Sequence, residues 1–371
     1  MQHRAFFDSA ARAQGPLLAL AGRVLGQPDA LASVREAVRS ALDDTALDGG
    51  GGRGGAWQLP ARASATAESG KGDEPSRAAL LMALLRAAEL RAEPLLLSRS
   101  GHRVSPTQAF PLLDTTLVLI PGVELEPGAG PLIIDPARGS SWLGALDEDL
   151  LGRDALMPGP EGARWLRLPS QAGQRNWTLN SKEREDGDFD VELAGVLSGA
   201  VAARVRDWDA ATRPAEGRPD ADLAWLGGPF RDVLAPEVEE LPGGRLRLRA
   251  HGVVPRAVAL PSGRLAAPLL PEPAAETPEV TWAYGRDVRP LRADILENWT
   301  FRGSRSGGGG ACSSRVTPYW QTDCIASWSG PVFTRRWKAE FFPGVLPAPA
   351  AAEVERWAEA GREVFLGVKA P

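Results

Sequence analysis

The first part of the chain spaces its apolar residues with the period of an α-helix. In 17-LLALAGRVL-25 and 31-LASVREAVRSAL-42 these residues recur at three- and four-residue intervals. Asp29 stands just before the second segment, where a side-chain oxygen can cap a helix. We therefore predict that residues 1 to about 46 are mostly helical.

The most strongly predicted helix begins within 70-GKGDEPSRAALLMALLRAAEL-90. The side chain of Asp73 can accept hydrogen bonds from the free backbone N–H groups of the first turn. Pro75 suits a position where no N–H donor is needed. The apolar side chains that follow predict a buried stripe along one face of the helix: Leu80, Leu81, Leu84, Leu85 and Ala88.

Beyond Arg91 the apolar residues form short continuous runs, which are typical of core strands. Three such runs lie between turn-forming residues: 93-EPLLLSRS-100, 115-TTLVLI-120 and 131-PLIID-135. Helices followed by strands around one core indicate an α+β fold for this half of the chain.

The later part of the chain has a β-rich pattern. Residues 175–196 predict a hairpin that turns at Asp186-Gly187, and a short helix is predicted at 199–211. In 243-GGRLRLRAHG-252 leucine alternates with arginine, as on a half-buried strand. A last helix is predicted at about 349–362.

Two glycine-rich runs, 48-DGGGGRGGA-56 and 303-GSRSGGGGAC-312, predict surface loops. The first run lacks a Lys-Ser/Thr ending and does not lie between a strand and a helix. A phosphate-binding loop is therefore not expected there.

Composition and charge exclude several classes of function. The 371 residues carry a formal net charge of −5, so no basic excess is present to neutralise nucleic-acid phosphates. Two cysteines and three scattered histidines do not supply the clustered ligands of a closed zinc site, and we expect neither a metal nor a cofactor. No apolar run is long enough to span a membrane. The N-terminal residues lack the apolar core of a signal peptide, so we expect a cytoplasmic protein or a leader outside this sequence.

The best candidate site combines the helix start at 70–76 with 131-PLIIDPARG-139. The free N–H groups and the dipole of a helix N-terminus stabilise negative charge, so a thiolate nucleophile would be placed there. An aspartate at a strand end, here Asp135, could orient a histidine base. The residues by themselves favour a simpler interpretation, in which Asp73 caps a core helix and Asp135 stabilises its turn.

This helix entry, the Ile-Ile-Asp-Pro turn at 133–136 and the order of the two resemble the transglutaminase-like fold of the papain-like superfamily. More narrowly, they resemble bacterial envelope proteins in which that core lies between β-rich domains of unknown function. Two later segments continue the resemblance: 149-DLLGRDALM-157 and 187-GDFDVELAGVLSGAVAARVR-206.

The resemblance covers most of the chain from about residue 17 to 365. It implies a transglutaminase-like core in residues 1–168, with helices packed on an antiparallel sheet. It further implies that residues 169–371 form a β-rich, sandwich-like region with a terminal helix.

The resemblance also implies a catalytic triad of which two members are replaced. Family members begin the helix with Gly-Asp-Cys, and Glu74 occupies the cysteine position here. Thr115 occupies the position that best matches the histidine, whereas Asp135 is retained, with Ala137 in place of the usual threonine. A carboxylate cannot perform the acyl transfer of a thiolate, and no imidazole remains to move protons. The resemblance thus implies a non-catalytic, envelope-associated module that binds a protein or peptide partner.

Two substituted catalytic sets form the competing hypothesis of a hydrolase or acyl transferase. A Ser76–His102–Asp135 triad would need the hydroxyl and imidazole within about 3 Å of each other. Ser76, however, is rotated roughly 200° around the helix from Glu74. Glu74 paired with Asp114 or Asp135 could act as acid and base on a glycan.

Two further features concern the C-terminal region. A bridge between Cys312 and Cys324 would stabilise the fold by roughly 3 kcal/mol and would indicate the periplasm or cell surface, whereas two free thiols fit the sequence equally well. Four tryptophans are expected to fill a β core rather than to stack on a ligand: Trp299, Trp320, Trp328 and Trp337.

Overall fold

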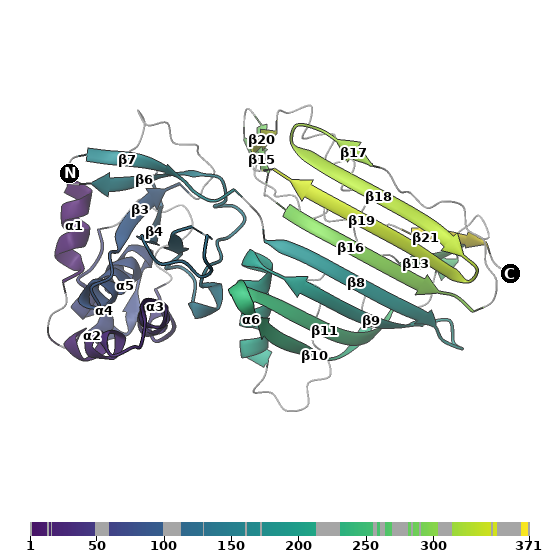
Figure 1. The fold of residues 1–371 in the computed structure, drawn as a ribbon, viewed down its shortest axis with the longest axis horizontal. Coiled ribbons are helices and arrows are strands. Elements are labelled where there is room, and N and C mark those ends of the chain that lie inside the picture. The colour runs from purple at the N-terminus through teal and green to yellow at the C-terminus, as the bar shows by residue number, and fades with distance from the viewer. Residues whose placement is uncertain are drawn as a thin grey trace. The chain divides into compact units, whose positions relative to one another are not determined.

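The protein, seen here in a computed structural model, consists of two compact units, Met1–Ser170 and Gln171–Pro371, whereas the sequence places the boundary between residues 168 and 169. Figure 1 shows the helices and strands of each unit. The structure describes residues 2–12, 15, 17–48, 59–98, 113–128, 130–159, 162–170, 173–212, 231–254, 258–259, 264–268, 281–282, 285–288, 291–302, 314–342, 344–346 and 365–369.

Helices form the first half of unit 1, as the apolar periodicity predicts. They are α1 (Gln2–Ala10), α2 (Leu17–Leu25), α3 (Ala30–Val38), the π-helical turn η1 (Arg39–Asp43), α4 (Ala63–Ser69) and α5 (Glu74–Ala87). The predicted cap of α3 is confirmed, because the side chain of Asp29 accepts a hydrogen bond of 2.8 Å from the Ala32 N–H.

The second half of unit 1 is an antiparallel sheet with the strand order β5-β4-β3-β6-β7. Its strands are β3 (Glu93–Leu97), β4 (Thr115–Ile120), β5 (Leu132–Ile134), β6 (Asp154–Gly159) and β7 (Gly162–Arg167), with the 3-10 turn η2 (Ser140–Trp142) between β5 and β6. Two short strands, β1 (Ala46–Leu47) and β2 (Lys71–Gly72), pair in parallel just before α5. The α+β order predicted for this unit is therefore confirmed.

Helix α5 is the centre of unit 1, and its burial differs from the expected single stripe. Every residue from Ser76 to Leu85 is buried, because α1, α2, α3 and α4 contact the helix on some sides and β4 contacts it on another. A helix enclosed in this way needs apolar residues around its whole circumference. The charged residue within that run, Arg77, is consequently an exception that requires partners.

Unit 2 is built on a large mixed sheet with the strand order β10-β11-β9-β8-β16-β19-β18-β17 (Figure 1). Its strands are β8 (Gln174–Glu183), β9 (Phe189–Leu197), β10 (Arg231–Leu241), β11 (Arg245–Val254), β16 (Leu291–Thr300), β17 (Arg315–Val316), β18 (Trp320–Ser329) and β19 (Val332–Phe341), and the turn η4 (Pro242–Gly244) joins β10 to β11. The predicted hairpin is β8 and β9, with Gly187 at a φ of 91° in the turn. The β8–β16 pair is parallel and the other pairs are antiparallel.

The remaining described elements of unit 2 are one helix and two small sheets. Helix α6 (Gly199–Thr212) follows β9 as predicted and contacts β8 and β11. The small sheets are β12-β13-β21 and β14-β15-β20, made of β12 (Val258–Ala259), β13 (Arg264–Pro268), β14 (Thr281–Trp282), β15 (Gly285–Val288), β20 (Gly344–Leu346) and β21 (Phe365–Lys369). The helix predicted at 349–362 lies outside the described residues, and the sandwich-like pairing of sheets stays a prediction.

The two faces of the large sheet differ in chemistry. The inner face carries the hydrophobic core of unit 2, which includes Trp299, Trp320 and Trp337 at 1% exposure each and the partly buried Trp328. The expected core role of these tryptophans is thus confirmed. On β11, Leu246 and the alternate residues after it are buried while the intervening arginines face outward, as the sequence alternation predicts.

The inner face also contains a buried ion pair. Glu297 on β16 lies directly opposite Arg335 on β19, and its carboxylate accepts a hydrogen bond from the guanidinium. The two side chains are 0% and 3% exposed. Two opposite charges in an aromatic core require each other, because removal of one would leave the other without compensation.

Candidate functional site

The start of α5 is a closely packed turn. Asp73 caps the helix by accepting a 2.9 Å hydrogen bond from the Ser76 N–H, and Pro75 occupies the first turn, both as predicted. Gly72, paired with Leu47 in the β1–β2 ladder, has no room for a side chain: a Cβ there would lie 2.8 Å from Cγ2 of Thr66. This packing fixes the direction in which Glu74 leaves the turn.

Glu74 reaches across to the sheet. Its Oε1 accepts a hydrogen bond of 2.5 Å from the backbone N–H of Thr116 on β4. Alternate residues of a strand share a face, and Val118 and Ile120 belong to the hydrophobic cluster of α5. Thr116 is therefore on the helix side of β4.

Thr115, the residue matched to the catalytic histidine, points into different surroundings. Its hydroxyl donates a hydrogen bond of 3.2 Å to Oδ1 of Asp114, and the side chain is buried. Thr115 shares its strand face with Leu117, opposite to the face of Thr116. The contact with Glu74 therefore comes from the neighbouring position.

Asp135 lies at the end of β5, next to the start of β4. The two strands pair antiparallel with Val118 opposite Ile134, so that continuing this register places Asp135 opposite Leu117, the residue after Thr116. The Asp135 carboxylate is 2% exposed and accepts a hydrogen bond of 2.9 Å from the Ala137 N–H. The predicted turn-stabilising role of Asp135 is thus present.

Arg77, one turn beyond Glu74, places a positive charge in the same region. It is 3% exposed, and its Nη2 donates a hydrogen bond of 2.5 Å to the Leu42 carbonyl. Burial lowers the pKa of the guanidinium below its ordinary value. Three nearby carboxylates raise the pKa in opposition, in decreasing order Asp135, Asp43 and Glu74.

Sequence reasoning identified Glu74 and Asp135 but missed Arg77, Asp43 and Thr116. Asp43, at the end of η1, accepts a hydrogen bond of 2.8 Å from the Ser140 N–H and so links η1 to the turn after β5. Arg77 carried a usable signal, because a single arginine within a long apolar run is expected to have a buried partner. We call Glu74, Arg77, Asp43, Asp135 and Thr116 the α5 ion cluster.

The alternative catalytic sets stay predictions. The hydroxyl of Ser76 is buried and accepts a hydrogen bond of 2.9 Å from the Ala61 N–H, which engages it in the packing of α5. His102 lies outside the described residues. Asp114 interacts with Thr115, and Glu74 interacts with Thr116. Among the described residues, no group of three histidine, cysteine, aspartate or glutamate side chains could hold a metal ion.

Two other expectations concern the disulfide bond and membrane-spanning helices. Cys324 on β18 is disulfide-bonded, and Cys312 lies outside the described residues, so the pairing of these two cysteines stays a prediction. In the part of the chain that the structure describes, no helix is both long and apolar enough to cross a bilayer.

Comparisons with known proteins give a distant structural similarity. No family model matches the chain, and no curated protein matches it. A crystal structure described as a "putative protease" from Parabacteroides distasonis is similar with a TM-score of 0.49 and 10% sequence identity. The alignment covers 99% of this chain and 58% of the Parabacteroides chain, so this chain spans less than two thirds of that protein's length. A similarity of this size assigns neither a family nor an activity.

Proposed function

We propose that this protein is a non-catalytic relative of transglutaminase-like enzymes and acts as a binding or scaffold module. The observation that carries the proposal is the contact of Glu74 with the Thr116 N–H beside the buried Arg77. The position from which a family nucleophile would act is thereby used for a structural interaction.

The electrostatics of the α5 ion cluster support this proposal. In acyl transfer, free N–H groups at a helix start and a neighbouring strand would stabilise a developing oxyanion. Here the carboxylate of Glu74 already accepts a hydrogen bond from one such group, the Thr116 N–H. Arg77 lies among three carboxylates. The Thr116 N–H is therefore engaged by the protein itself and is not open to a substrate oxygen, although Arg77 offsets only part of the negative charge of the cluster.

The partner and compartment are proposed on weaker grounds. We infer a protein or peptide partner, held at the former cleft or on the β-rich unit, from the family resemblance alone. An envelope location is supported by the disulfide at Cys324, because disulfides persist in oxidising compartments.

A turnover assay tests the absence of catalysis. The full chain would be incubated with a glutamine-containing peptide and a primary amine, and separately with unmodified peptides, and products would be followed by mass spectrometry. We expect no product above the buffer control. Turnover that Glu74→Gln abolishes would overturn the proposal, because Glu74 would then be catalytic.

A thiol-labelling experiment tests whether the cluster occupies an inherited site. Glu74→Cys would be combined with Thr116→His or, as the matched control, with Thr115→His, and reaction with iodoacetamide would be timed near neutral pH. Because position 116 is on the helix side of β4, only the Thr116→His pair should speed labelling beyond Glu74→Cys alone. Faster labelling with Thr115→His would show that position 115 is the one facing Glu74. Circular dichroism would establish that each variant is folded.

A further inference from the structure

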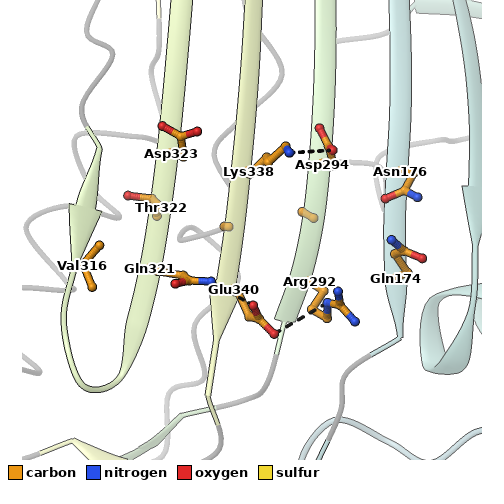
Figure 2. Close-up of a pocket in the computed structure, with 12 residues that line it drawn as sticks. Gln174, Asn176, Arg292, Asp294, Val316, Gln321, Thr322, Asp323, Lys338 and Glu340 are labelled. Atoms are coloured by element: carbon orange, nitrogen blue, oxygen red, sulfur yellow. Dashed lines mark hydrogen bonds and ion pairs between the residues drawn. The ribbon is translucent and has the colours of Figure 1, made fainter.

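The last strand of the large sheet, β17, pairs with its neighbour over a very short length. Among the described residues, two pairs join it to β18, Arg315 with Thr322 and Val316 with Gln321. Figure 2 shows this edge of the sheet, with Val316 across from Gln321. So short a strand gains too little from pairing to offset the conformational entropy that its ordering costs. Further contacts are therefore needed to keep β17 on the sheet.

Ser314, which directly precedes β17, supplies one such contact. Its hydroxyl donates a hydrogen bond of 2.9 Å to the Asp323 carboxylate and accepts one of 3.1 Å from the Cys324 N–H. The Cys324 N–H therefore points toward the edge that β17 covers. Backbone groups of alternate residues on a strand point to the same neighbour, so Thr322, Cys324 and Ala326 all present theirs to this edge.

A disulfide at Cys324 supplies a second contact. Cys324 is disulfide-bonded, and the sequence contains one other cysteine, Cys312. Within a single chain, the bond can join these two residues alone. Cys312 lies outside the described residues, but in the sequence it stands two residues before Ser314 and three before β17. The bond therefore ties the chain just ahead of β17 to the strand on which β17 pairs.

The position of Cys324 makes this bond accessible to chemistry. The residue is half-buried and lies at the border of the hydrophobic core of unit 2. Disulfides that are partly exposed are reduced more easily than disulfides enclosed in a core.

We propose that this disulfide is a redox-sensitive latch that holds β17 on the large sheet. A dithiol reductant would open the latch by exchange: one thiolate attacks a cysteine sulfur, and the second thiol resolves the mixed disulfide that forms. Two electrons and two protons pass to the cysteines, which end as thiols, while the reductant ends as a disulfide. Without the bond, β17 and Ser314 detach, and the backbone groups of Thr322 and Cys324 lose their partners.

The edge that would be uncovered has few protective features. Residues 324–329 read CIASWS, without a proline or a charged side chain, and Ile325 is 63% exposed. Natural edge strands usually carry such protective residues, because unpaired N–H and C=O groups can pair with another chain. The latch thus controls access to a strand edge of unit 2. It does not depend on the absence of catalysis at the α5 ion cluster.

Hydrogen–deuterium exchange of the full chain tests the latch. Peptides that cover residues 314–324 would be compared in the oxidised protein, after treatment with dithiothreitol, and in Cys312→Ala, which removes the bond without altering a described residue. We expect exchange in this segment to be roughly tenfold faster or more in the last two states. Peptides from the β8–β9 hairpin should exchange equally in all three states.

Three controls make the result specific to the bond. Dithiothreitol should not change the exchange of Cys312→Ala, which has no disulfide to reduce. Re-oxidation of the reduced parent should restore its protection. Mass spectrometry of the non-reduced protein should find the peptides of Cys312 and Cys324 linked within one chain.

Several results would overturn the proposal. Unchanged exchange at 314–324 after reduction would mean that β17 stays on the sheet without the bond. Faster exchange throughout the large sheet would mean that the bond stabilises the whole unit. Protection that re-oxidation fails to restore, or a bond between two copies of the chain, would exclude a reversible latch.

Discussion

We expect Glu74 to contribute to folding through its acceptor atom more than through its charge. Thr116 is fully buried, so its N–H has no access to water when Glu74 is absent. Glu74→Ala should cost about 1–3 kcal/mol in the free energy of unfolding. Glu74→Gln keeps an oxygen that can accept the N–H, and should cost less. Urea unfolding of the two variants measures the difference, and equal losses would show that the hydrogen bond has no net value.

Arg77 is expected to be the most sensitive residue of the cluster. Arg77→Met leaves Asp135, at 2% exposure, without its positive neighbour. Loss of one partner of a buried charge cluster costs about 3–5 kcal/mol. Arg167 on β7, which pairs with Asp154 at side-chain exposures of 51% and 47%, provides the control, because Arg167→Met should cost well under 1 kcal/mol. Similar effects of the two substitutions in urea unfolding would contradict this role for Arg77.

Asp294, which lies beside Lys338 on the outer face of the large sheet (Figure 2), makes a pH-dependent contribution to stability. Its hydrogen bond with Arg336 is the largest cause that lowers the pKa of the carboxyl, against a smaller opposing effect of burial. A carboxyl whose folded pKa lies below its unfolded value stabilises the fold at neutral pH, and this stability is lost as the pH falls through the folded pKa.

Asp294→Asn should therefore reduce the acid sensitivity of folding. Between about pH 7 and pH 3, the parent should lose more stability than the variant, by less than about 1 kcal/mol because both side chains of the Asp294–Arg336 pair are partly exposed to solvent. Urea midpoints at both pH values measure this difference. An Asp294→Asn variant with the acid sensitivity of the parent would exclude the predicted linkage.

Residues that act within one turn could be predicted from the sequence, and residues that act across elements could not. Asp29 and Asp73 cap helices through neighbours three positions away, which a sequence pattern records. The contact between Glu74 and Thr116 spans 42 positions. The one-residue difference between Thr115 and Thr116 changes the strand face, and no pattern in the run TTLVLI determines which threonine faces the helix.

At the scale of elements, the buried pair of Glu297 and Arg335 should fix how β16 pairs with β19. Arg335→Met or Glu297→Met alone should cost about 3–5 kcal/mol, because either leaves a buried charge uncompensated. The double variant replaces both charges with apolar side chains and should cost much less than the sum. A double-mutant cycle by urea unfolding measures this coupling, and additive effects would show that the two residues stabilise the sheet independently.

Elements with strong local patterns were predicted at their observed positions, while weaker ones were missed. The runs at β3, β4 and β5 are continuous and apolar, and the β8–β9 turn contains Asp-Gly. Strands β6 and β7 were not predicted, because the apolar run of β6 is short and ends at Pro158, and β7 is exposed or half-buried along its length and carries no clear alternation. The parallel contact of β1 with β2 involves two residues of each strand, too few for any period.

At the scale of the molecule, the order of strands in the large sheet follows from long-range pairing. Strands β8 and β16 are neighbours although β9, α6 and β10 to β15 separate them along the chain. Sequence periodicity indicates which residues face the core but not which strand lies beside which. The parallel pairing of β8 with β16 was therefore out of reach of sequence reasoning.

The two units should unfold as separate cooperative structures. Among the described residues, the hydrophobic cluster of unit 1 runs from Phe7 to Trp165 and that of unit 2 from Trp177 to Phe341. A unit with its own core can fold alone, so fragments 1–170 and 171–371 should each show cooperative thermal unfolding.

In the full chain, the same division predicts which transition each substitution affects. Arg77→Met should lower the midpoint of one calorimetric transition and Arg335→Met that of the other, because each acts on a different core. The fragments assign each transition to its unit. If both substitutions shift one shared transition and the fragments fail to fold, the two cores form a single thermodynamic domain.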